Sequence, residues 1–183
     1  MLFRSKAVPE PDYTTKAKIE RTQWVGFGDV GDGSTGRYHV TFTDSDGNKI
    51  NQDAYCVEPR FPGPDGSFTK VGVKEYKDSK ELAKVVYYGT SMSGDDCFFK
   101  QKGNTGYTEN EQYGIVHWTA AKIYGSDAWT YCINSKGKAA VKALIDYADS
   151  MPSIPDARIS FKKTELTAEV PEGKEYQQTP ENV

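Results

Sequence analysis

Residues 54–68 read AYCVEPRFPGPDGSF, and the character of the chain changes across this stretch. Its first residues end a predicted strand over 49–57, which places Cys56 at the strand terminus. Residues 58–66 then hold three prolines and two glycines. A helix or a central strand does not tolerate this composition, because proline lacks a backbone N–H. We therefore expect a loop directly after the cysteine, with strands before it and helices after it.

The chain before this stretch predicts an antiparallel meander. Residues 21–27 and 37–43 are rich in aromatic and β-branched side chains, as strands are. The segment GDVGDGSTG (28–36) between them predicts a flexible hairpin connection, and residues 44–48, DSDGN, carry a strong turn signal. The strand over 49–57 completes the meander.

The chain after this stretch predicts three helices, over residues 78–89, 108–124 and 138–149. Apolar residues recur with helical spacing in the first and third of these segments. The second begins with Thr108 and Glu111, which form the sequence signature of a capping box. A glycine follows the second helix and a proline lies just beyond the third, as is typical of helix ends.

The remaining segments complete the predicted domain. Residues 90–107 predict a long loop, and residues 157–170 return to strand character. The order of strands, helices and strands predicts an α+β fold, an antiparallel β-sheet or sandwich with a helical insert of about three helices. We assign residues 1–18 to an N-terminal lead-in or tail, residues 19–170 to one domain, and residues 171–183 to a C-terminal edge strand or a linker.

Composition excludes several classes of protein. The chain has 183 residues, 26 acidic and 23 basic, with a formal net charge of -3. No apolar run approaches the roughly 18 residues of a membrane span, and no basic excess indicates a nucleic-acid surface. The aromatic fraction of 13% argues against disorder. We expect a soluble, tyrosine-rich globular domain that contacts neither nucleic acid nor membrane.

Motifs for metals and cofactors are absent from the sequence. Cys56, Cys97 and Cys132 lack the CxxC or CxxH pairs of a zinc site. The aspartates of residues 44–48 do not fit a calcium loop, and no GxSxG motif indicates a serine hydrolase. We therefore expect no metal and no cofactor. Cys97 and Cys132 either pair as a disulfide or are buried free thiols.

Cys56 on its own is either a small buried hydrophobe or a sulfur presented at the edge of a sheet. The sequence around Cys56 favours the second interpretation. The run AYCVEPRFPGPDGSF, followed by ELAKVVYYG (81–89) and by a helix that carries Gln, His and Trp and ends in YG, resembles the thioester domains of Gram-positive surface adhesins and pilus-tip proteins. The resemblance runs in order from about Tyr55 to Tyr147 and implies that residues 19–170 form a thioester-type adhesin domain.

The resemblance implies a specific chemistry. Such domains hold a bond between a cysteine sulfur and a glutamine side-chain carbonyl, formed with loss of ammonia, and Cys56 would supply the sulfur. An amine, such as a lysine of a host extracellular protein, exchanges this activated acyl group for a stable amide. The resemblance thus implies single-event covalent capture rather than enzymatic turnover. It also implies an extracellular location on a bacterial cell surface, with further domains and a cell-wall anchor in the same protein.

The glutamine partner has two candidate positions. By likeness to the family motif, Gln112 and the three residues after it fit, whereas counting along the helix places His117 nearer the usual glutamine position. The two are five residues apart and about 140° apart around a helix, so we expect only one to face Cys56. Gln112 there would allow a thioester. His117 would instead give a Cys–His pair, as in cysteine hydrolases or transglutaminases.

Three functions are therefore open: a covalent adhesin, a Cys–His acyl-transfer or hydrolase-like enzyme, and a non-reactive structural pilus or stalk module. Gln101, Gln177 and Gln178 are weaker acyl candidates, because they lie in loop or terminal segments.

Overall fold

The antiparallel meander predicted from the sequence is confirmed. The computed structural model describes residues 2–4, 13–43, 49–58, 66–74, 79–154 and 165–168. In it, β3 (Ser34–Thr43) pairs antiparallel with β2 (Tyr13–Gly26) on one side and with β4 (Lys49–Cys56) on the other. β2 begins well before the predicted strand, within the segment assigned as a lead-in or tail. Cys56 ends β4, as predicted.

The sheet closes into a barrel with the strand order β1-β4-β3-β2-β5-β6. Two of the closing strands are short, β1 (Leu2–Arg4) and β6 (Glu165–Ala168), and β1 pairs parallel with both β4 and β6. β5 (Gly66–Lys74) pairs antiparallel with β2 and was not predicted. The first part of β2 pairs with β5, and its later part pairs with β3 alone. Register shifts lie along β2 in both pairings, and such irregularities increase the twist of a strand, which allows it to change partners.

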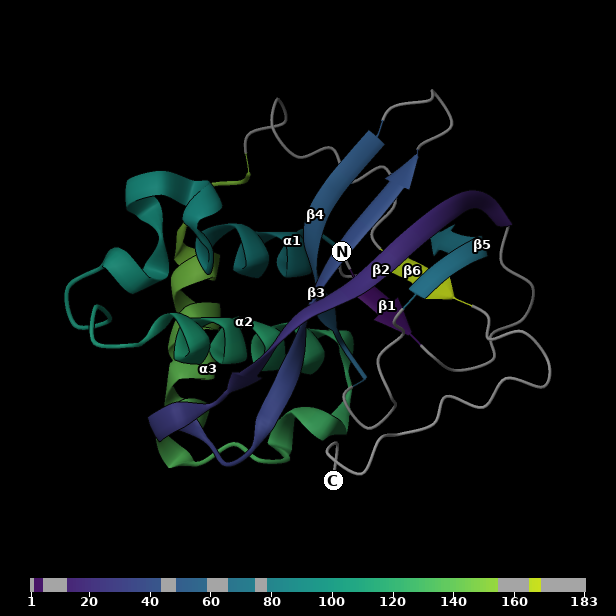
Figure 1. Cartoon of the computed structure of the whole chain (residues 1–183). Helices are drawn as coiled ribbons and strands as arrows, with labels where there is room; N and C mark the ends of the chain where they lie inside the picture. The colour runs from purple at the N-terminus through teal and green to yellow at the C-terminus, as the bar shows by residue number, and fades with distance from the viewer. Residues whose placement is uncertain are drawn as a thin grey trace.

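The three predicted helices are confirmed as α1 (Ser79–Tyr88), α2 (Glu109–Tyr124) and α3 (Ser135–Ser150). Figure 1 shows them gathered beside the strands, so the α+β fold is also confirmed. α3 begins earlier than predicted, because the side chain of Asn134 caps it by accepting a hydrogen bond from the Gly137 N–H. No helix in the described part of the chain is long and apolar enough to cross a membrane.

The segment over 90–107, predicted as a long loop, contains two short 3₁₀ helices, η2 (Ser91–Asp96) and η3 (Phe98–Lys100). Phe98 and Phe99 of η3 are buried in the hydrophobic core. The aromatic side chains fix this part of the chain against the helices, although its Gly, Ser and Asp content indicates a loop.

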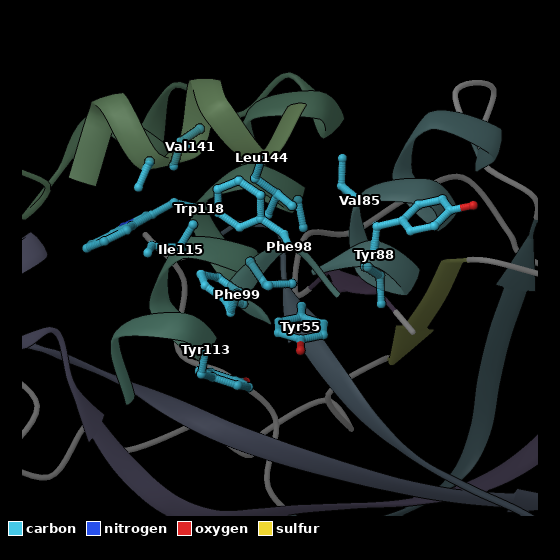
Figure 2. Close-up of a cluster of buried hydrophobic side chains, with 14 of the residues drawn as sticks. Tyr55, Val85, Tyr88, Phe98, Phe99, Tyr113, Ile115, Trp118, Val141 and Leu144 are labelled. Atoms are coloured by element: carbon cyan, nitrogen blue, oxygen red, sulfur yellow. The ribbon is translucent and has the colours of Figure 1, made fainter. Parts of the chain in front are cut away.

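α2 is the central helix of the core. Residues 113–121 are buried without interruption, which covers every side of the helix, and α2 contacts α1, α3, β2 and β4. Figure 2 shows Ile115 and Trp118 of α2 between the α3 side chains Val141 and Leu144 and the strand side of the core.

The segment over 28–36, predicted as a flexible hairpin connection, is instead packed against the helices. It forms a short 3₁₀ helix, η1 (Gly28–Val30), and Val30 is fully buried. The Asp32 N–H donates to the Cys132 carbonyl at 2.7 Å. Gly31 permits this approach, because a Cβ there would lie 2.2 Å from that same carbonyl oxygen. The glycine content therefore reflects close packing rather than flexibility.

Glu111 joins η1 to the start of α2. Its side chain is buried, and its carboxylate accepts hydrogen bonds from the Asp29 N–H at 2.9 Å, the Thr108 N–H at 2.7 Å and the Thr108 hydroxyl at 2.9 Å. The predicted capping box is thus confirmed. Burial alone would raise the pKa of Glu111, but the hydrogen bonds from Thr108 and Asp29 lower it below its usual value.

We expect Glu111→Ala to lower the free energy of unfolding by about 2 kcal/mol at neutral pH, because three donors lose their acceptor. Chemical denaturation measures this change. The matched control is Glu109→Ala, since the Glu109 side chain is 79% exposed. The pKa of Glu111 is lowered in the folded protein from its ordinary value of 4.5, so the difference between wild type and Glu111→Ala should shrink as the pH falls from 4.5 through this lower pKa. Equal effects of the two variants would contradict the prediction.

Candidate functional site

Cys56 lies in a buried segment at the end of β4. The whole run from Ala54 to Glu58 is buried, and Cys56 is 7% exposed. Burial raises the pKa of the Cys56 thiol to about 12; the Glu58 carboxylate adds to this rise, and a backbone hydrogen bond from Glu58 partly opposes it. The thiol is therefore protonated at neutral pH.

Tyr55 and Tyr113 bring the strand of the cysteine into contact with α2. Their rings stack with centroids 5.0 Å apart, and the Tyr113 hydroxyl donates to the Gly36 and Ala54 carbonyls, each at 3.3 Å. Figure 2 shows Tyr55 on the strand and Tyr113 on the helix. Burial raises the pKa of both tyrosines, so both hydroxyls remain protonated donors. The residue before Cys56 therefore meets the residue after Gln112.

Gln112 lies in the second turn of α2 and is half-buried. Its side-chain Nε2 donates to the Tyr107 carbonyl at 2.8 Å, which holds the amide near the start of the helix. Gln112 is about 100° around the helix from Tyr113.

His117 lies one turn after Tyr113 on α2. It is 1% exposed, and its ring stacks on Tyr113 with centroids 6.3 Å apart. Within the described part of the chain, its Nδ1 is buried without a hydrogen-bond partner. Burial lowers the pKa of His117 to about 4, so the imidazole is neutral at neutral pH. Gln112 and His117 thus both lie within about one turn of the Tyr55–Tyr113 contact, and the expectation that only one faces Cys56 stays a prediction.

The electrostatics at Cys56 and His117 are the reverse of those in a catalytic Cys–His pair. Such a pair depends on a thiolate, which a neighbouring imidazolium stabilises. Here burial raises the pKa of the thiol and lowers that of the imidazole, so both groups are uncharged at neutral pH. This environment does not favour a thiolate nucleophile.

Glu58 is a buried charged residue of the same segment, to which the sequence analysis assigned no role. The Ser126 hydroxyl donates to its carboxylate Oε2 at 3.2 Å. Ser126 follows the end of α2, so this contact joins the chain after β4 to the far end of the helix. Glu58 lies beyond the end of β4, where the chain bends, and no local sequence signal indicates its contact with Ser126, which is 68 residues away.

The other candidate cysteines and glutamines are Cys97, Cys132, Gln101, Gln177 and Gln178. All three cysteines are free of disulfide bonds, and Cys97 is buried whereas Cys132 is exposed. The Cys97–Cys132 disulfide alternative is therefore not present. The Gln101 side chain donates to the Asp95 and Cys97 carbonyls. Gln177 and Gln178 lie outside the described residues.

A family model described as a thioester domain matches residues 16–155. The chain belongs to the thioester domain family. This finding confirms the resemblance inferred from residues 54–68 and the helices that follow. No curated protein and no solved structure matches the chain.

In this thioester domain, the matched region runs from β2 to just beyond α3 and includes Cys56, Gln112 and His117. It also includes Glu58 and Ser126. The roles of these residues, and the domain limits at residues 19 and 170, remain predictions.

Proposed function

We propose that this thioester domain stores an internal thioester between Cys56 and Gln112 and uses it to capture an amine-bearing ligand covalently. The observation that carries the proposal is the stacked pair of Tyr55 and Tyr113, which joins the strand of the cysteine to the helical turn of the glutamine. The burial of Cys56 supports it as well, because a site that excludes water protects a reactive acyl group from hydrolysis.

The proposed chemistry has two steps. First, the Cys56 Sγ attacks the Gln112 side-chain carbonyl carbon, the C–N bond breaks, and ammonia leaves with the thiol proton. Second, an amine attacks the same carbon and the C–S bond breaks. The leaving thiolate takes up the proton that the nitrogen loses, which gives an amide and a thiol. The amide is stable, so each molecule reacts once and does not turn over as an enzyme.

The proposed ligand is a host extracellular protein or another molecule that offers a primary amine, such as a lysine side chain. We place the domain on a bacterial cell surface as part of an adhesin with further domains. Family membership supports this role, because the surface proteins that the sequence resembles use such domains for attachment.

Intact mass spectrometry tests the thioester. We expect the wild-type chain to be lighter than its sequence mass by one ammonia, and methylamine to add its own mass. Cys56→Ala and Gln112→Ala should have full mass and should not react. Gln101→Ala is the matched control, and should still lack one ammonia.

Two outcomes would contradict the proposal. A wild-type chain at full mass, with Cys56 open to alkylation under denaturing conditions, would mean that no thioester forms and would leave a non-reactive structural module. A Gln112→Ala chain that still lacks ammonia would mean that another side chain supplies the acyl group.

A further inference from the structure

The Arg37 side chain on β3 forms ion pairs with both elements that carry the proposed thioester. Its Nη2 donates to the Asp53 carboxylate on β4 at 3.2 Å, and its Nη1 donates to the Glu109 carboxylate on α2 at 2.9 Å. Asp53 lies three residues before Cys56. Glu109 lies three residues before Gln112, at the same end of α2. One guanidinium therefore links the strand of the cysteine to the helical turn of the glutamine.

Arg37 is also fixed against the tyrosine pair that joins these two elements. Its guanidinium carbon lies 5.4 Å from the centroid of the Tyr113 ring, within the range of a cation–π interaction. The Tyr113 hydroxyl donates to the carbonyl of Gly36, the residue before Arg37. The same ring stacks on Tyr55 of β4. A planar guanidinium donates in fixed directions, so these contacts restrict how β4 and α2 can shift relative to each other.

We infer that Arg37 is a positioning residue for thioester formation, an inference that rests on the proposed function. Its two ion pairs hold β4 and the first turn of α2 in the arrangement that lets the Cys56 sulfur reach the Gln112 carbonyl carbon. In this role Arg37 acts through Asp53 and Glu109 and not on the reacting atoms. A reaction between two side chains depends steeply on their alignment, so a small shift between the two elements slows it strongly.

This positioning role differs in its effects from a general contribution to stability. Once formed, the thioester is itself a covalent link between β4 and α2, so Arg37 is needed for its formation and not for its reaction with an amine. The Asp53 and Glu109 side chains are 45% and 79% exposed. Ion pairs of such exposed groups contribute little to the free energy of unfolding, because water and salt screen them. Loss of Arg37 should therefore slow formation of the thioester more than it lowers stability.

The test follows the loss of ammonia by intact mass at intervals after cell-free synthesis of the chain. We expect formation to be about 10-fold slower in Arg37→Met, which keeps an unbranched side chain but neither the charge nor the donors. Arg37→Lys keeps the charge without the planar guanidinium and should give an intermediate rate. In both variants, the molecules that have lost ammonia should react with methylamine at the wild-type rate. Lys142→Met, which removes an exposed ion pair with Asp146 on α3, is the matched control and should form the thioester at the wild-type rate.

The outcomes separate the role of Arg37 from the proposed function. An Arg37→Met chain that forms the thioester at the wild-type rate overturns the inference and leaves the proposed function intact. An Arg37→Met thioester that also reacts more slowly with methylamine overturns it as well, since Arg37 would then act on the acyl group itself. Should Arg37→Met fail to fold, the exposed change Glu109→Gln decides: formation should be about threefold slower, and a wild-type rate overturns the inference. A wild type at full mass overturns the proposed function, and the inference with it.

Discussion

Replacing His117 by leucine is expected to make the domain less sensitive to mild acid. Burial holds the pKa of His117 at about 4 in the folded protein, against an ordinary value of 6.5. As the pH falls below 6.5, the unfolded chain therefore binds a proton at this residue that the folded chain does not. Burial of neutral His117 therefore does not reduce the free energy of unfolding above pH 6.5. The free energy of unfolding falls as the pH decreases from 6.5 towards 4.

The expected effect is large for one residue. The full difference in pKa corresponds to about 3 kcal/mol of unfolding free energy, of which about 2 kcal/mol should be lost by pH 5. Urea denaturation at pH 7 and pH 5 measures this loss. His117→Leu should lose about 2 kcal/mol less than wild type between these two values.

His39 provides the matched control, because it is the other histidine of the chain and its side chain is 36% exposed. His39→Gln should keep the wild-type loss of stability between pH 7 and pH 5. If His117→Leu loses as much stability as wild type over this range, the neutral buried imidazole is not the cause.

Truncation of Trp118 should produce the largest loss of stability among the side chains considered. We expect Trp118→Ala to lower the free energy of unfolding by about 4 kcal/mol. Trp118 is 2% exposed, and its ring lies 4.2 Å from that of Phe27, measured between centroids. It also packs so closely on Gly31 that a Cβ there would lie 2.7 Å from the indole. Alanine would leave a cavity between α2 and η1 that this backbone cannot readily fill.

Trp24→Ala is the matched control, because it also removes a tryptophan but at an exposed position. Trp24 is 44% exposed, and its ring contacts the Arg21 guanidinium at 4.5 Å. We expect this variant to lose less than about 1 kcal/mol in the same urea measurement at neutral pH. Comparable losses in the two variants would show that Trp118 does not carry the packing of α2.

The helices could be predicted because their signals are local. The capping box of Thr108 and Glu111 lies within one turn, and it sets the start of α2 correctly. The start of α3 was missed because the residues of its first turn are not apolar. Position 137 requires glycine, because a Cβ on this residue would lie 2.3 Å from the Val30 carbonyl oxygen. This contact exists only in the folded chain.

The barrel could not be predicted, because one of its strands has a weak sequence pattern and its closure joins residues far apart in the sequence. β5 contains two glycines and two lysines, which weaken the strand pattern, and β1 is paired to β6 across nearly the whole chain. Contacts between residues far apart in the sequence also limited the prediction of the candidate site. Cys56 was identified from its neighbours in sequence, whereas the setting of Glu58 depends on Ser126, which is 68 residues away.

The position of α2 at the centre of the core has a mechanical consequence for the proposed capture. A ligand joined to Gln112 would apply its tension to a helix that neighbouring elements enclose and that is anchored at its first turn by Glu111. A pulling force would then be distributed over the packing contacts of the hydrophobic core, whereas a ligand joined to a surface loop would unfold that loop first.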